Sequence, residues 1–177
     1  MSLPEPAPRV LPVTSVLYGD SVFLKEALDS LQILFGEIVL FSEPFPFDMT
    51  DYYQDEMGAS IQRVWLCFAP LQDPSQLTVW KEKCIEIEEI LGGDGKRLVN
   101  IDPGYLDHGK LVLASCKAAP DKIYLGRGVF AHTCLRYRRG EFHGPEHSFA
   151  DFIDGRFDVF FHSAKALLRK LLRGQGQ

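Results

Sequence analysis

The stretch Asn100-Ile-Asp-Pro-Gly-Tyr-Leu-Asp-His-Gly-Lys-Leu-Val-Leu-Ala-Ser-Cys-Lys117 joins two apolar runs of the 177-residue chain. Its Asp-Pro-Gly triplet at 102–104 is typical of a turn, because Pro fixes φ and Gly permits a positive φ. We therefore expect a strand over 97–101, then a turn, then a strand over 110–116. The stretch also carries polar residues that a turn does not need: Asp102, Tyr105, Lys110 and Lys117.

The segments before this stretch predict alternating strands and helices. Short apolar runs bounded by turn residues indicate strands, and apolar residues at helical spacing behind Asp20 and Asp73-Pro74 indicate two helices. Strands are expected over 13–18, 37–42, 60–69 and 97–101, and helices over 21–35 and 74–91. The order β-α-β-β-α-β is typical of a ferredoxin-like sandwich, with two helices on one face of an antiparallel sheet.

The rest of the chain predicts an extension of this core. Segments 122–125 and 128–138 are expected to form a hairpin, and 156–173 a final helix. The expected fold class is α+β: a ferredoxin-like βαββαβ sandwich core extended by a β-hairpin and a C-terminal helix. Residues 1–12 contain four prolines and should form a flexible arm, and 13–177 a single α+β domain.

The net charge of −5 hides a gradient along the chain. Residues 1–95 hold 5 basic and 16 acidic residues, whereas residues 96–139 hold 9 basic and 3 acidic. The whole molecule should therefore repel bulk nucleic acid, while its basic segment could hold an anion. The alternative is that the two halves neutralise each other across a shared sheet.

Four cysteines, at 67, 84, 116 and 134, lack the spacing of a zinc knuckle or a redox pair. Each lies in an apolar or strand-like run, so we expect reduced, buried thiols, Cys116 included. The N-terminus lacks the pattern of a secretory signal, and no apolar run approaches the roughly 20 residues that span a bilayer. These features predict a soluble, cytoplasmic protein that does not enter a membrane.

Two regions carry candidate ligand-binding residues. In the acidic, aromatic loop at 43–58, Tyr53 could stack on a base and Glu56 could bind a cation or act as a base. The alternative is a structural loop whose aromatic rings cap the sheet. Around the predicted turn, lysines would bind phosphate or carboxylate as point charges. Because Lys110 and Lys117 are seven residues apart, a regular strand would point them to opposite faces unless a bulge redirects one.

The histidines do not predict a metal site. His143 and His147 are separated by a Gly-Pro pair, so their spacing does not place them on one helical face. His132 is expected to be a satisfied sheet residue, which leaves His108 in the predicted turn. A metal-dependent hydrolase would need Glu56, Asp102 and a histidine to converge. No metal is predicted, and the sequence identifies neither a catalytic residue nor a cofactor.

Two motifs resemble those of a known family. Phe47-Asp-Met-Thr-Asp-Tyr-Tyr-Gln-Asp-Glu-Met-Gly58 is similar to its Thr-x-Tyr-Tyr-x-x-Glu-Met-Gly motif, and Asn100–Leu106, Lys110–Lys117 and Ile123–Gly126 are similar to its second motif. The family is an uncharacterised bacterial one, a domain of unknown function sometimes labelled GTP-binding. The resemblance spans nearly all of the chain after residue 12 and implies no established activity. No Walker-type loop supports the GTP label. Cys116 departs from the hydroxyl residue expected there, which argues against catalysis at that position.

Two hypotheses follow, and the sequence does not decide whether the protein is an enzyme. The first is a site for a small phosphorylated or nucleotide-like ligand, formed by the 52–58 loop and the 102–117 turn. Its expected ligand-binding residues are Tyr53, Glu56, Asp102, Tyr105, Lys110, Lys117 and Arg127. The second is a non-enzymatic module that binds RNA or a protein through the basic hairpin at 122–139. The oligomeric state is open.

Overall fold

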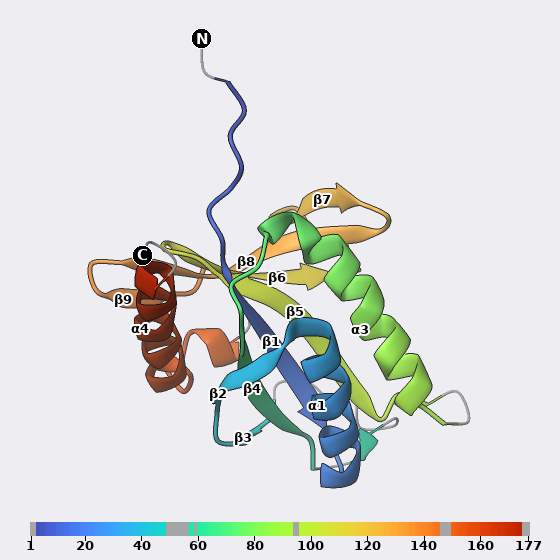
Figure 1. Ribbon diagram of the computed structural model, residues 1–177. Helices are drawn as coiled ribbons and strands as arrows, with labels where there is room; N and C mark the ends of the chain where they lie inside the picture. The colour runs from blue at the N-terminus through green and yellow to red at the C-terminus, as the bar shows by residue number, and fades with distance from the viewer. Residues whose placement is uncertain (1–2, 49–56, 59, 94–95, 146–149, 175–177) are drawn as a thin grey trace.

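The computed structural model of the protein describes residues 3–48, 57–58, 60–93, 96–145 and 150–174. Its strands are β1 (Leu11–Tyr18), β2 (Glu37–Phe41), β3 (Phe45–Pro46), β4 (Gln62–Ala69), β5 (Val99–Leu106), β6 (Lys110–Ser115), β7 (Ile123–Gly126), β8 (Val129–Arg138) and β9 (Glu141–His143). They form one antiparallel sheet of nine strands in the order β2-β4-β1-β5-β6-β8-β7, with β3 added to β4 and β9 to β8 (Figure 1). The mixed α and β class is thus confirmed.

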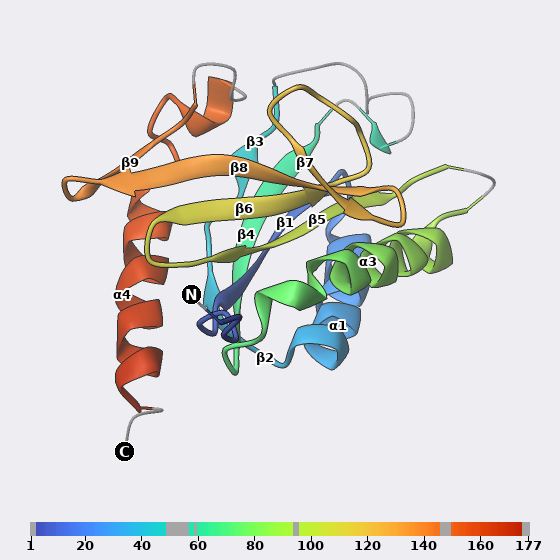
Figure 2. The ribbon, with the colours of Figure 1, turned by 90° about the horizontal axis from the view of Figure 1, so that it is seen from above.

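Helices cover both faces of this sheet (Figures 1 and 2). The α-helices of the described residues are α1 (Ser21–Phe35), α3 (Leu77–Leu91) and α4 (Asp158–Gly174), and two 3-10 turns are η2 (Pro74–Gln76) and η3 (Ala150–Phe152). The helix predicted over 21–35 has the predicted bounds, because Asp20 Oδ1 accepts the Val22 N–H at 2.8 Å and Gly36, at φ +100°, ends it. No helix in the described part of the chain is long and apolar enough to cross a membrane.

Each face of the sheet buries its own apolar cluster. On the face of α1 and α3, the Phe35 ring packs edge-on against Trp80, with ring centroids 5.5 Å apart. On the face of α4, Trp65 is fully buried among four phenylalanine rings whose centroids lie 5.0 to 6.4 Å away. These rings are Phe152, Phe157, Phe160 and Phe161. Aromatic side chains therefore fix the sheet from both sides.

The prediction of a turn at 102–104 is wrong, because β5 continues through these residues. Ser15 of β1 pairs with Asp102, and Thr14 pairs with Pro103. The turn comes later, at 107–109, where Asp107 Oδ1 accepts the backbone N–H groups of Gly109 and Lys110 at 2.7 and 2.8 Å. Pro103 and Gly104, which are turn-forming residue types, thus lie inside a strand.

Pro103 fits the strand because of the direction in which its missing N–H would point. The N–H and C=O of Ile101 both bond to side chains of α3 on the side away from β1. Peptide groups alternate in direction along an antiparallel strand, so position 103 also faces away from β1. The proline therefore costs the β1 ladder no hydrogen bond.

Gly104 lies where β6 comes close to β5. A Cβ at this position would lie 2.1 Å from the carbonyl oxygen of Val112 and 2.6 Å from Leu113 Cδ2. Pairing between the two strands extends only from Gly104–Leu113 to Leu106–Leu111. Beyond Leu113, β6 keeps only its pairing with β8, and the sheet is split between β5 and β6.

Two further expectations are corrected. β1 begins at Leu11 rather than Val13, and the buried Val10 before it forms a bridge with Gln72. Cys116 is exposed, unlike the buried Cys67, Cys84 and Cys134, because it lies just after β6 ends. All four cysteines are free thiols.

We predict that Gly104→Ala destabilises the protein by about 1 to 3 kcal/mol, because the new methyl group meets backbone atoms that cannot move independently. Urea unfolding measures the difference. Gly109→Ala is the matched control: its Cβ would find only Asp107 Oδ1, at 3.8 Å, and the cost should stay within about 0.5 kcal/mol. Equal effects of the two substitutions would contradict the close approach of β6.

Candidate functional site

A polar pocket of about 330 Å³ lies at the split between β5 and β6. The strands supply the walls, and α3 closes the split from one side of the sheet. The charged and polar lining residues come from six regions of the chain: Ser15, Arg63, Lys81, Glu88, Arg97, Asn100, Asp102, Ser115, Lys117, Lys122 and His132. The pocket is thus rich in charge, although the sheet around it is apolar on both faces.

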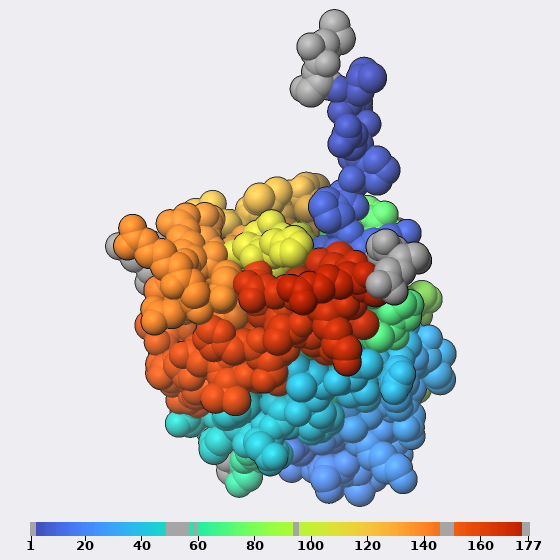
Figure 3. All heavy atoms as spheres, turned by 60° about the vertical axis from the view of Figure 1, so that its left-hand side comes forward, coloured from blue at the N-terminus to red at the C-terminus, as the bar shows by residue number. Residues whose placement is uncertain are grey.

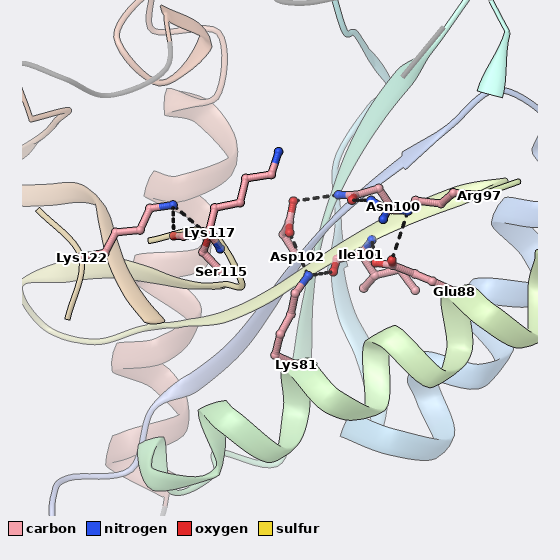
Figure 4. Close-up of polar contacts among 9 residues, drawn as sticks. All are labelled: Lys81, Glu88, Arg97, Asn100, Ile101, Asp102, Ser115, Lys117 and Lys122. Carbon is pink, nitrogen blue, oxygen red and sulfur yellow. Dashed lines mark hydrogen bonds and ion pairs between the residues drawn. The ribbon is translucent and has the colours of Figure 1, made fainter. Parts of the chain in front are cut away.

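Two side chains of α3 take the place of β6 along the open edge of β5. Lys81 Nζ donates to the Ile101 carbonyl at 2.9 Å, and Glu88 Oε1 accepts the Ile101 N–H at 2.6 Å (Figure 4). Lys81 and Glu88 are seven residues apart, so they lie on one face of the helix two turns apart. They satisfy backbone groups that would otherwise be buried without partners.

The same two residues belong to a ring of polar contacts. Asp102 Oδ1 accepts a hydrogen bond from Lys81 Nζ at 3.1 Å, and Asp102 Oδ2 accepts one from Asn100 Nδ2 at 2.9 Å. Arg97 Nη1 donates to Asn100 Oδ1 at 2.8 Å, and its Nε lies 3.6 Å from Glu88 Oε2 (Figure 4). Each member is therefore positioned by two neighbours, while the Asp102 side chain remains 33% exposed.

The ring sets the charge state of its members. Burial acts to raise the pKa of Asp102, but the Lys81 ammonium and the hydrogen bonds from Lys81 and Asn100 outweigh it, and the pKa is lowered. Burial acts to lower the pKa of Lys81, but Asp102 and Glu88 raise it above its ordinary value. Burial raises the pKa of Glu88 despite the opposing effect of Lys81. Lys81 and Asp102 are thus a charged pair at neutral pH.

The opposite wall of the pocket carries two lysines from the connection after β6. Lys122 Nζ donates to Ser115 Oγ at 2.8 Å and to the Lys117 carbonyl at 3.1 Å. Figure 4 shows Lys117 and Lys122 across from Lys81 and Asp102. Within the described residues, Lys122 contacts only these uncharged oxygens and no carboxylate, so its positive charge is held in place without being neutralised.

His132 of β8 completes this wall and lies between the Asp121 carboxylate and the Cys134 thiol. Its Nε2 lies 3.2 Å from Asp121 Oδ2, and its Nδ1 lies 3.6 Å from Cys134 Sγ. Burial and the Lys122 charge lower the pKa of His132, against the effect of Asp121. Burial strongly raises the pKa of the Cys134 thiol, so the group stays protonated and is a poor nucleophile. The line of Cys, His and Asp therefore does not support cysteine catalysis.

Arg63 of β4 lies at the corner of the pocket nearest the acidic loop. Its guanidinium forms a buried ion pair with Asp151 and lies 4.8 Å from the centre of the Phe47 ring. Met57, at the other end of that loop, packs against Leu17, whose pairing partner in β4 is Arg63. The described ends of the loop thus meet the sheet beside this corner.

Two buried polar atoms of the lining lack partners. Ser15 is 2% exposed and Trp65 is fully buried, and neither Ser15 Oγ nor Trp65 Nε1 has a hydrogen-bond partner within the described part of the chain. Both residues line the pocket. Because an unsatisfied buried donor costs free energy, such atoms mark the places where a bound polar group would be most favourable.

The structure brings together two of the seven predicted site residues. Asp102 and Lys117 line the pocket. Tyr105 is partly buried against the cluster beneath α1 and α3, Lys110 pairs with Asp107 in the turn, and Arg127 pairs with Glu82 at 2.7 Å. Tyr53 and Glu56 lie outside the described residues.

The sequence-based prediction missed most of the pocket. It did not include Arg63, Lys81, Glu88, Asn100 and Lys122. Lys81 and Glu88 carried a usable signal, because they alternate with Leu77 and Cys84 along the buried stripe of α3. Charged residues on a buried helical stripe require partners, and the nearest candidates follow in β5. Among the residues described, no group of three or more His, Cys, Asp or Glu side chains is placed to hold a metal ion.

Comparison with known proteins identifies a matching family. The family model described as Domain of unknown function (DUF4416) matches residues 8–167, which is most of the chain. No curated protein and no solved structure matches the sequence.

We predict that Lys81→Met destabilises the protein by about 3 to 5 kcal/mol, because it removes the cation that pairs with Asp102 and the donor to the buried Ile101 carbonyl. Lys83→Met on the same helix is the control. Lys83 pairs with Glu86 at the surface, with both side chains about half exposed, and its loss should cost less than about 0.5 kcal/mol. Urea unfolding compares them, and a mild effect at Lys81 would contradict its role in the ring.

We also predict that the stabilising effect of Asp102 disappears in acid. Because folding lowers the pKa of Asp102 below its ordinary 3.8, its contribution is complete above that pH and is lost as the pH falls through the folded value. The difference in unfolding free energy between the native protein and Asp102→Asn should therefore be constant near neutral pH and shrink below pH 3.8. A difference that does not change in acid would show that the carboxylate charge is not what matters.

Proposed function

The chain belongs to this family, whose description assigns no activity, and from the pocket between β5 and β6 we propose that it binds a small phosphorylated or nucleotide-like ligand. The lining supports this: it holds five lysines and arginines but only two acidic residues. These cations are concentrated in a protein whose net charge is −5. A local excess of positive charge in a concave, partly desolvated site attracts anions.

The observation that carries the proposal is the Lys122 ammonium. Uncharged oxygens of Ser115 and Lys117 orient it toward the pocket wall, so it keeps its full charge for a ligand. An ammonium positioned in advance loses little entropy on binding phosphate. By contrast, the charge of Lys81 is already paired with the Asp102 carboxylate.

The two walls suggest how a ligand would lie. Lys117 and Lys122 would bind its phosphate, and the partly exposed carboxylate of Asp102 would accept a hydrogen bond from a hydroxyl or amino group at the other end. The volume of about 330 Å³ is near the lower bound for small-molecule pockets, which favours a sugar phosphate or mononucleotide over a dinucleotide. Tyr53 and Glu56, which the sequence also predicts as ligand-binding residues, lie outside the described residues. The proposal assigns binding and no catalytic residue.

Two finer expectations are part of the same proposal. The order β2-β4-β1-β5, with α1 and α3 on one face, supports a ferredoxin-like arrangement for residues 11–106. The free thiols of Cys67, Cys84 and Cys134 in the core support a reducing, cytoplasmic setting.

The test is a thermal melt of the purified protein with orthophosphate, sugar phosphates and nucleoside monophosphates. A ligand at 100 times its dissociation constant should stabilise the protein by about 2.7 kcal/mol, and Lys122→Gln should abolish the shift. Lys110→Gln is the control, since Lys110 lies in the turn with Asp107 and should leave the shift intact. No shift with any of these anions, or equal losses in both variants, would refute the proposal.

A further inference from the structure

Two hairpin tips hold an arginine in the left-handed backbone region. Arg127, between β7 and β8, has φ +54°, and Arg139, between β8 and β9, has φ +52°. Asn or Gly is preferred at such positions, because other side chains crowd the backbone there. The Arg127 side chain forms a 2.7 Å ion pair with Glu82 of α3, which ties that turn to the fold. Arg139 forms no hydrogen bond or ion pair with any described residue, so the fold does not account for it.

Arg139 has two further arginines beside it. Arg136 and Arg138 alternate with Tyr137 along β8, and their cross-strand neighbours on β9 are His143 and Glu141. We call residues 136–143 the β8–β9 ribbon. An open concavity beside the ribbon is lined by all three arginines, and Glu141 is the acidic residue that the described part of the chain adds to this lining. Alternate residues of a strand are about 7 Å apart, so the charges form a closely spaced row.

The other side of the ribbon is fixed to the protein. The rings of Tyr137 and Phe142 pack together at 4.9 Å and both contact His162 of α4. Arg169 of α4 lies 6.0 Å from the Tyr137 ring, which places another cation at the same end of the molecule. Figure 3 shows the ribbon and α4 side by side on one face. The arginines are therefore presented from a rigid support.

We propose that the β8–β9 ribbon binds the phosphate backbone of double-stranded nucleic acid. The guanidinium group of arginine matches phosphate with two parallel hydrogen bonds, and the ribbon uses arginine at all three positions. Single strands are bound mainly by stacking bases on exposed aromatic rings. The aromatic rings of this ribbon, Tyr137 and Phe142, pack toward α4 instead, which favours a duplex read by its backbone alone.

The negative net charge of the chain does not oppose this surface. Its acidic excess lies in residues 1–95, which hold 16 acidic and 5 basic residues. Helices α1 and α3 carry a net charge of −3 between them, and both views show them at the end of the molecule away from β9 (Figures 1 and 2). The ribbon is also separate from the pocket, so this proposal stands whether or not the pocket binds a phosphorylated ligand.

The experiment is fluorescence anisotropy of a short labelled DNA or RNA duplex, titrated with the full chain at several salt concentrations. Three phosphate contacts predict a slope of log affinity against log salt of about −2.7. Arg139→Asn should weaken binding for every sequence alike and reduce the slope by about 0.9. Asn tolerates the left-handed conformation, so the hairpin should survive, and the melting temperature checks this.

Arg127→Asn is the matched control, because it changes an arginine with the same backbone conformation at the other hairpin tip. It should leave duplex binding unchanged and change the melting temperature little, because the Arg127 side chain is 66% exposed in its pair with Glu82 and Asn suits the left-handed backbone. Equal losses of binding in both variants, binding that does not depend on salt, or no binding to either duplex would overturn the proposal. So would an acidic peptide that binds the ribbon while the duplexes do not, since that outcome identifies a protein-docking surface.

Discussion

The sheet is held open at its centre by two hydrogen bonds of the Ile101 backbone, whose carbonyl accepts from Lys81 and whose N–H donates to Glu88. A strand edge inside a protein must satisfy its N–H and C=O groups, and normally the next strand does so. Here α3 supplies an ammonium and a carboxylate instead. Because each of these charges needs a partner, the ring through Asp102, Asn100 and Arg97 follows from the same requirement. The pocket exists because this ring occupies the place of a β ladder.

Stability alone does not explain such a ring. The free-energy cost of desolvating a buried ion pair often cancels the attraction between its charges. Replacing such a pair by apolar residues of similar size frequently leaves the protein equally stable. A continued β5–β6 ladder would have satisfied Ile101 without any charge. The ring keeps a partly exposed carboxylate and several cations in fixed positions around a cavity, and this preorganisation is what a binding site needs. This preorganisation is consistent with the ligand site that we propose.

How far the sequence predicts this site depends on whether a feature is local. The N-cap at Asp20 and the stop at Gly36 depend on neighbouring residues, and α1 was predicted with its observed bounds. The Pro103-Gly104 pair was assigned to a turn, because its use depends on a split and a close approach made by a strand further along the chain. Asp102 and Lys117 were selected because the stretch 100–117 carries more polar residues than a turn needs, whereas the contribution of α3 required knowing which helix faces that edge.

The charge gradient along the sequence was open to two explanations, and each holds for different residues. Arg127–Glu82 and Arg97–Glu88 join the basic segment to the acidic one, as mutual neutralisation requires. Lys122 and the arginines of the β8–β9 ribbon have no carboxylate partner within the described residues, so neutralisation does not account for them. Strand β8 runs from the pocket, which His132 lines, to the ribbon, where it carries Arg136 and Arg138. A single paired strand therefore joins two cationic regions that are lined by different residues, which supports treating them as two separate proposed anion sites.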